Sequence, residues 1–313
     1  MSDATADDGP LPSVPSRDDV DLARLRLYVA VLAFVAFFLA PIESGVVTSM
    51  KTEAAITATR PLFPPVWPFT AWPANGLTLA NYATGLDVLW RGIVNSLLFA
   101  VPATAVSALL GSFTAYGLTL VDWKYQVPVL VLFVAGIFIP YQAVLVPLSQ
   151  LYSVVDVASL LWFVWALTGL SSEYAKLVEL GVTHVAYGLP ICTVLFRSYY
   201  KGMSEEMMES ARLDGATIRR TYRRIVFPLS GPMFAVVLIY QFTQIWNDLL
   251  FALVIVTSAS SPAAPVTLKL AGLGSSLSGL DFGLRMAGAF VAALPTLVVY
   301  VLFGDQFAEG VAT

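Results

Sequence analysis

The residues with the greatest capacity for chemistry lie in one short polar stretch, ESARLDGATIRRTYRRIVFP, which runs from Glu209 to Pro228. This stretch holds five arginines between Arg212 and Arg224, with Gly215 among them. Guanidinium groups bind anionic lipid headgroups and hold a loop on the inner side of a membrane. The stretch is therefore suited to binding and anchoring rather than to breaking covalent bonds.

Histidine and cysteine, the usual catalytic and metal-binding residues, occur once each, as His184 and Cys192. An intrachain disulfide is impossible, a His/Cys metal site is not expected, and a Ser-His-Asp triad has at most one histidine available. Cys192 lies in an apolar run, where we expect a packing role. For His184 we expect a structural role, with lining of a solute pathway as the alternative. We expect no catalytic residue, no metal and no cofactor.

A second polar group lies in an otherwise apolar segment and comprises Gln241, Gln244, Asn247 and Asp248. In a helix Gln241, Gln244 and Asp248 would share one face, with Asn247 beside it. Such groups are costly in lipid and should face a bundle interior or an aqueous cavity. They either line the path of a neutral, hydroxyl-rich solute or form hydrogen bonds that fix helix packing.

The elements that must position these residues are membrane helices. Hydrophobic residues make up 58% of the 313 residues and charged residues only 12%, against about 25% charged residues in soluble domains. A spanning helix needs about 20 largely apolar residues. We therefore predict an all-α membrane protein with six transmembrane helices, and a shorter Trp-rich run at 157–170 that is interfacial or re-entrant. The predicted spans are 27–47, 93–118, 127–149, 180–199, 232–256 and 286–304.

The distribution of positive charge predicts the orientation of these spans. With six spans and a cytoplasmic N-terminus, 11 of the 17 Lys and Arg residues lie inside, as the positive-inside tendency requires. Both termini are then cytoplasmic, in the plasma membrane of a prokaryote. Residues 1–26 are predicted to be a disordered acidic tail, and 27–313 a transmembrane domain. Residues 48–92 form an extracytoplasmic loop, for which docking of an external partner is one interpretation.

The polar stretch itself predicts a cytoplasmic helix-turn-helix within residues 200–230. Ser204 is a suitable N-cap for a helix that ends near Asp214, and Gly215 can adopt the left-handed turn at little cost. A second helix would begin at Ala216 and end at Pro228. Its apolar face comprises Ile218, Tyr222 and Ile225, and its basic face comprises Arg219, Arg220, Arg223 and Arg224.

The spacing within this stretch resembles the EAA loop of permease subunits of binding-protein-dependent ABC importers. That pattern is Glu-Ala-Ala, three residues, Gly, nine residues, Ile-x-Leu-Pro. Here Glu209-Ser210-Ala211 precedes Gly215, and Ile225-Val226-Phe227-Pro228 follows at the same spacing. Ser210 and Phe227 depart from the pattern at small positions.

Other segments resemble the carbohydrate-uptake, maltose-type branch of that family. They are LTLANY at 77–82, NSLLFA at 95–100 and WND at 246–248, and the likeness extends over roughly residues 22–310. Residues 150–180 look longer than is usual in this branch. The resemblance implies a type I importer fold and a sugar or related polyol as solute.

The resemblance also implies partners and roles. They are a dimer of cytoplasmic ATPase subunits, a second permease subunit in a heterodimer, and an extracytoplasmic solute-binding protein, all at a lipid bilayer and without nucleic acid. The residues implied to couple the loop to the ATPase are Glu209, Ser210, Ala211, Asp214, Gly215, Ile225 and Pro228.

Three other functions are alternatives to an ATP-driven importer of sugars. The chain lacks the G-x-x-x-x-G-K-[ST] phosphate cradle, so it is not itself the ATPase and is not expected to be an enzyme. An ABC permease for a different small solute remains an alternative. A secondary transporter or channel is disfavoured by the lack of inverted repeats, and an intramembrane enzyme by the single histidine.

Overall fold

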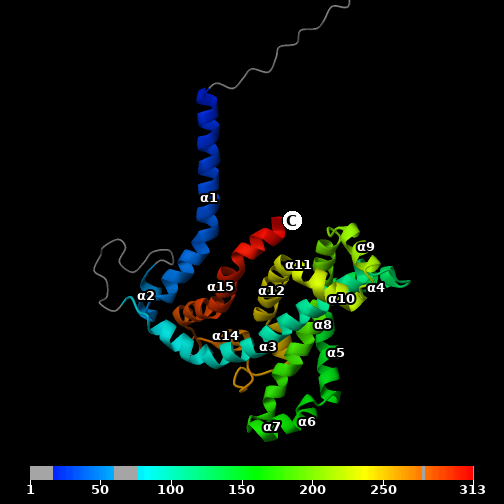
Figure 1. The fold of residues 1–313 in the computed structure, drawn as a ribbon. Helices are drawn as coiled ribbons and strands as arrows, with labels where there is room; N and C mark the ends of the chain where they lie inside the picture. The colour runs from blue at the N-terminus through cyan, green and yellow to red at the C-terminus, as the bar shows by residue number, and fades with distance from the viewer. Residues whose placement is uncertain (1–16, 60–75, 277–278, 313) are drawn as a thin grey trace, which may run out of the picture. The chain divides into compact units, whose positions relative to one another are not determined.

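The computed structural model describes residues 17–59, 76–276 and 279–312, and its architecture is almost entirely helical (Figure 1). The chain divides into two compact units, residues 1–78 and 79–313, and each is described by itself. The predicted all-α membrane class is confirmed.

The first unit contains helix α1 (Arg17–Ser49), helix α2 (Glu53–Ala58) and an antiparallel bridge between Lys51 and Leu77. Residues 24–49 of α1 are long and apolar enough to cross a membrane. The helix begins inside the segment predicted to be a disordered tail, so that prediction is wrong for residues 17–26. The rest of the tail, and the prolines between 61 and 73, lie outside the described residues.

The second unit holds the remaining helices and one short antiparallel hairpin. Its elements are α3 (Ala80–Thr119), α4 (Gln126–Ile137), α5 (Tyr141–Val154), α6 (Val157–Leu160), α7 (Trp162–Thr168), α8 (Ala175–Tyr200), α9 (Glu205–Leu213), α10 (Ile218–Thr221), α11 (Phe227–Leu229), α12 (Gly231–Trp246), α13 (Leu250–Ile255), α14 (Val266–Gly272), β1 (Ser275–Ser276), β2 (Gly279–Leu280) and α15 (Phe282–Ala312).

Within the described residues, four helices are long and apolar enough to cross a membrane, and two bent helix pairs raise the number to six if each pair is one span. The first pair, α4 and α5, is bent by 99°, so the predicted single helix over 127–149 is wrong. Pro140 lies between the two helices and has no N–H to continue the first one.

The second bent pair joins residues 218–229 to α12 at 76°. A separate break follows α12, which ends at Trp246, whereas α13 starts at Leu250. The predicted span over 232–256 is therefore also wrong as one helix. Asp248 holds this break, because its backbone carbonyl accepts a hydrogen bond from Thr267 Oγ1 at 2.7 Å and its carboxylate accepts one from the Phe251 N–H at 3.1 Å.

Two other boundaries differ from expectation in simpler ways. Helix α3 starts at Ala80 rather than at residue 93, because Asp87 and Arg91 interrupt the apolar run without breaking the helix. The Trp-rich run at 157–170 forms α6 and α7, of four and seven residues. Neither is long enough to cross a bilayer.

Helix α3 is the central element of the second unit and packs against α8, α12, α14 and α15. Between residues 104 and 112 the buried residues of α3 are all small: Thr104, Ser107, Ala108, Gly111 and Ser112. Small side chains let membrane helices approach closely and gain van der Waals contact. At Gly111 an added Cβ would lie 2.5 Å from the Cys192 Cβ, so the helices touch there with no room to spare.

The two halves of α3 belong to different apolar clusters. Leu89, Ile93 and Phe99 join a cluster with α12 to α15, while Ala108 and Ala115 join another that includes Met208 of α9. Helix α9, which follows α8 and is not one of the candidate spans, is therefore packed into the same core as the spans.

The segment between α13 and α14 is fixed to the middle of α3 by side-chain hydrogen bonds. The Asn95 Nδ2 donates to the carbonyls of Pro262 at 2.8 Å and Ala264 at 2.9 Å. Ser96 Oγ accepts from the Val266 N–H at 2.9 Å. Asn95 and Ser96 are almost completely buried, so these bonds satisfy polar groups that would be costly in an apolar interior.

The close approach at Gly111 gives a direct test of this packing. We expect Gly111→Leu to force α3 and α8 apart and to lower the melting temperature of the purified protein, since overpacking of a tight core costs about 1–3 kcal/mol. The matched control is Gly117→Leu on the same helix, where an added Cβ meets nothing within 4 Å. Equal melting temperatures for the two variants would contradict the role of this contact.

Candidate functional site

The helix-turn-helix predicted from the polar stretch is present in the structure. Ser204 caps α9, with its Oγ accepting from the Met207 N–H at 3.3 Å. Gly215 has a φ of +70°, and the N–H groups of Gly215 and Ala216 donate to the carbonyls of Arg212 and Ala211, each at 3.0 Å. This pair of bonds is a Schellman motif, which closes a helix with a left-handed glycine.

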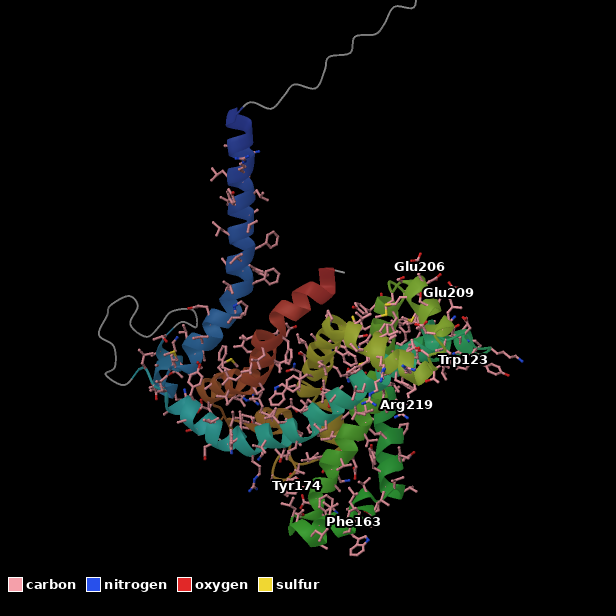
Figure 2. All side chains as sticks on the ribbon, in the orientation of Figure 1. Trp123, Phe163, Tyr174, Glu206, Glu209 and Arg219 are labelled. Carbon is pink, nitrogen blue, oxygen red and sulfur yellow. The ribbon has the colours of Figure 1, made fainter. Side chains whose placement is uncertain are left out.

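Helix α9 has one face on the spans and one face free. Met208 and Ala211 are buried, whereas Glu206 and Glu209 are exposed and point away from the spans (Figure 2). The Arg212 Nη2 donates to the Leu120 carbonyl at 2.8 Å at the end of α3. The helix is therefore held by its inner face and offers an acidic outer face.

The residues implied by the resemblance divide between these two faces. Ala211 is buried, Ile225 is half-buried, and Glu209, Ser210, Asp214, Gly215 and Pro228 are exposed. Sequence reasoning missed Leu213, whose side chain is 82% exposed at the end of α9. An apolar residue at the end of a helix of mostly polar residues, two positions before the turn glycine, was the available signal.

The second helix of the loop differs from the predicted amphipathic one. Helix α10 continues through a π-helical turn at residues 222–226 into α11. A π turn inserts an extra residue and shifts the faces of a helix. As a result Thr221 and Val226 are buried, whereas Ile218 is 57% exposed, so its predicted place on the apolar face is wrong. The four arginines are exposed, as expected.

Gln241, predicted as a pathway residue, lies between helices. Its side chain is buried, with Nε2 at 3.5 Å from the His184 carbonyl and Oε1 at 3.8 Å from Cys192 Sγ. The amide fills the space over Gly188, where a Cβ would overlap it. These contacts favour the packing alternative for Gln241.

The other three predicted pathway residues are either exposed or lie beyond the end of α12. Gln244 and Asn247 are exposed, and the Asn247 Nδ2 donates to the Thr243 carbonyl at 2.9 Å. Because α12 ends at Trp246, Asp248 lies beyond the helix. The predicted single polar stripe is therefore not formed.

Asp248 instead lies next to His184, within a group of aromatic side chains. Its Oδ2 lies 3.5 Å from His184 Nε2, and the two atoms do not have hydrogen-bond geometry. The His184 ring stacks on Phe99, and Phe251 packs edge-on against it. These rings come from α3, α8 and α13.

Two tyrosines extend this group. The rings of Tyr141 and Tyr187 stack with centroids 4.4 Å apart, and both contact Phe251. The Tyr187 hydroxyl also donates to the Ile139 carbonyl. Rings from α5 and α8 thus lie near a carboxylate, an arrangement that sequence spacing could not reveal because the residues are far apart in the chain.

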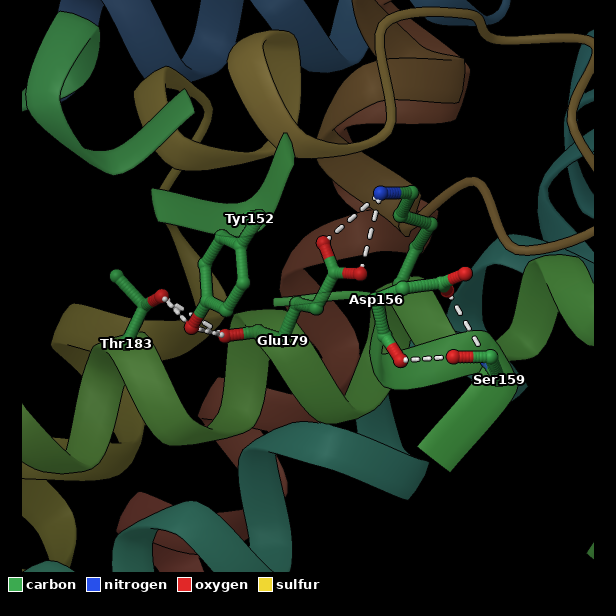
Figure 3. A network of polar contacts seen from close by, with 6 residues as sticks. Tyr152, Asp156, Ser159, Glu179 and Thr183 are labelled. Atoms are coloured by element: carbon green, nitrogen blue, oxygen red, sulfur yellow. Dashed lines mark hydrogen bonds and ion pairs between the residues drawn. The ribbon is translucent and has the colours of Figure 1, made fainter. Parts of the chain in front are cut away.

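The end of α8 opposite to α9 carries another polar network (Figure 3). The Tyr152 hydroxyl donates to the Glu179 carbonyl and contacts Thr183 Oγ1, each at 2.9 Å. The buried Glu179 carboxylate pairs with Lys176 Nζ at 2.9 Å. These contacts fasten α5 to the start of α8.

Asp156 caps α6 within the same network. Its Oδ1 accepts from the Ser159 N–H at 3.0 Å, and this backbone hydrogen bond lowers the pKa of the Asp156 carboxyl from its usual value. The contribution of this cap is present above the unfolded pKa and is lost as pH falls through the lowered one.

Comparison with known proteins adds the family. Residues 107–308 match the family described as the binding-protein-dependent transport system inner membrane component. The chain is 47% identical over 298 residues to the xylose/arabinose import permease protein XacI of Haloferax volcanii, covering 95% of this chain and 94% of the relative.

Two further proteins resemble the chain, and they differ in how much of each chain the match covers. The alpha-glucoside transport system permease protein AglG of Rhizobium meliloti is 34% identical over 244 residues, covering 77% of this chain and 61% of the relative. A solved bacterial ABC transporter involved in alginate import is 17% identical, with a TM-score of 0.64, covering 95% of this chain and 100% of that one, and supports the fold. The chain belongs to the family of inner membrane components of binding-protein-dependent transport systems.

Proposed function

We propose that this chain is the permease subunit of an ATP-driven importer that carries a sugar or a related polyol, with pentoses as the first candidates. The observation that carries the proposal is the loop that contains α9. Residues 209–228 have the spacing of the EAA pattern, the inner face of α9 packs into the core, and its outer face is exposed. The pentose class is suggested by the 47% identity to the xylose/arabinose import permease protein XacI.

In this proposal α9 is a rigid plug that enters a partner ATPase. Glu209 and Ser210 lie on the exposed side and contact the partner directly, with Leu213 as an apolar anchor. Ala211 seats the helix against the spans, and the Gly215 turn fixes its direction. Ile225 and Pro228 orient the following helix, and Asp214 precedes the turn.

The remaining partners follow from the same proposal. A second permease subunit completes the pathway, and an extracytoplasmic binding protein delivers the solute near α6 and α7, at the other end of α8 from α9. We propose that the α9 end and both termini face the cytoplasm; the positive-inside tendency supports this orientation, because Arg219, Arg220, Arg223 and Arg224 are exposed on the loop.

For the solute path we propose the region around Asp248. A carboxylate can accept hydrogen bonds from sugar hydroxyls, and neighbouring aromatic rings supply flat apolar surface. Tyr141 and Tyr187 are the members that sequence reasoning missed, whereas lining of a solute pathway was already the alternative role for His184. Gln244 and Asn247 remain exposed candidates, while Gln241 positions α12 against α8.

The transport function is tested by purifying the chain from its native membranes and assaying uptake of radiolabelled xylose and arabinose. We expect an ATPase subunit to copurify and uptake to stop when ATP is depleted. Absence of any ATPase subunit, together with uptake that continues without ATP, would show a gradient-driven transporter instead.

The coupling role is tested at Gly215. We expect Gly215→Val to lower solute uptake per ATP hydrolysed, because an L-residue in the left-handed conformation costs about 1–2 kcal/mol and reorients α9. The matched control is Gly169→Val, because Gly169 ends α7 with a φ of +67° and equally open surroundings. Wild-type coupling in Gly215→Val, or equal loss in the control, contradicts the proposed role.

The path is tested at Asp248. We expect Asp248→Asn to reduce uptake by about 10- to 100-fold, the range for losing hydrogen bonds to a charged group, while the amide still caps α13. The control Asp281→Asn changes a carboxylate that caps the start of α15 in the same way, with Oδ1 accepting from the Leu284 N–H at 2.9 Å. Unchanged uptake in Asp248→Asn would remove Asp248 from the path.

A further inference from the structure

A buried hydroxyl on α3 contacts the start and the middle of the loop that contains α9, α10 and α11. Ser112 Oγ lies 2.6 Å from the Tyr200 hydroxyl and 2.8 Å from the Tyr222 hydroxyl. Ser112 and Tyr200 are completely buried. Tyr200 is the last residue of α8 before the loop, and Tyr222 begins the π turn within it.

A third contact brings in the hinge after the loop. Ser230 lies at the 76° bend between α11 and α12. Its Oγ is within hydrogen-bond distance of the Tyr200 hydroxyl, at 3.3 Å, and of the Val226 carbonyl, at 2.5 Å. The start, the π turn and the end of the loop therefore converge on three hydroxyl groups around Ser112.

Further contacts from the same face of α3 reach the loop. The Tyr116 hydroxyl donates to the Ile218 carbonyl at 3.1 Å, and the Leu120 carbonyl accepts from Arg212 at 2.8 Å. Ser112, Tyr116 and Leu120 are four residues apart in turn, so they lie one above the other on one face of the helix. One stripe of α3 thus holds α9, α10 and the π turn.

We propose that Ser112 is a positioning residue that transmits movement of the loop to α3, acting with the hydroxyls of Tyr200 and Tyr222. This inference rests on the proposed coupling function. A buried hydroxyl without a partner is costly, so the three groups are expected to move together rather than separate. Helix α3 would then carry a displacement of α9 to the end of the bundle that bears Leu89 and Ile93.

The test uses the complete transporter, with its ATPase and binding-protein partners, reconstituted in liposomes with xylose as the probe. Uptake per ATP hydrolysed is measured for Ser112→Ala, Tyr222→Phe and the double variant. We expect each single variant to lower this ratio by about 2- to 10-fold, as for loss of one hydrogen bond. The double variant should fall no further than the worse single variant, because the two residues act through one contact.

The matched control is Ser107→Ala. Ser107 is a buried hydroxyl on the same helix, and its Oγ has no hydrogen-bond partner among the described residues. We expect it to retain the wild-type ratio. A rescue variant, Ser112→Thr, keeps the hydroxyl and should recover coupling that Ser112→Ala loses, at equal melting temperatures.

The outcomes separate this inference from the function on which it rests. If Gly215→Val lowers the uptake ratio but Ser112→Ala and Tyr222→Phe do not, the hydroxyl contact carries no movement and the coupling function stands. If Gly215→Val leaves the ratio unchanged as well, the coupling function itself is wrong. An equal loss in Ser107→Ala, or additive losses in the double variant, would reduce Ser112 to a general packing residue. If Ser112→Ala does not fold, Tyr222→Phe alone decides the inference.

Discussion

The close packing of α3 on α8 is the constraint on which the rest of the second unit depends. At Gly111 the two helices touch with no space for even a methyl group. Apolar side chains gain little by leaving lipid for a protein interior, so this contact relies on shape and on van der Waals attraction. Every backbone polar group buried along it must find its partner within the bundle.

That constraint explains where the polar side chains of the second unit are used. Near the middle of α3, Asn95 and Ser96 hold the segment before α14. Nearer the α9 end, Ser112 joins two tyrosines. Side chains that looked like solute ligands in the sequence, above all Gln241, instead fix one helix against another. The solute region that we propose is made of aromatic rings and one carboxylate.

Local signals in the sequence were sufficient to predict α9, although not the π turn that follows it in the same loop. A serine cap and a turn glycine act within a few residues, so Ser204 and Gly215 predicted the ends of α9 correctly. The bends were not predictable in this way. Pro102 and Pro190 lie inside continuous helices, whereas Pro140 separates two helices bent by 99°. The presence of a proline therefore does not by itself predict where a membrane helix breaks.

The aromatic group around Asp248 was hidden for a related reason. Its rings belong to α3, α5, α8 and α13, and only tertiary packing brings them together. The expected stripe on α12 assumed an unbroken helix, but the Asp248 carboxylate and carbonyl both stabilise the break that removes it from that helix.

The hydrogen bonds of Asn95 also bear on how the chain is inserted during synthesis. Its partners, the carbonyls of Pro262 and Ala264, lie 167 and 169 residues later in the chain. When α3 first leaves the ribosome these acceptors do not yet exist, and its amide must remain hydrated or bind the insertion machinery. Final burial of this helix therefore waits for the C-terminal part of the protein, so a nascent chain truncated before residue 262 would carry an unsatisfied amide in its central span.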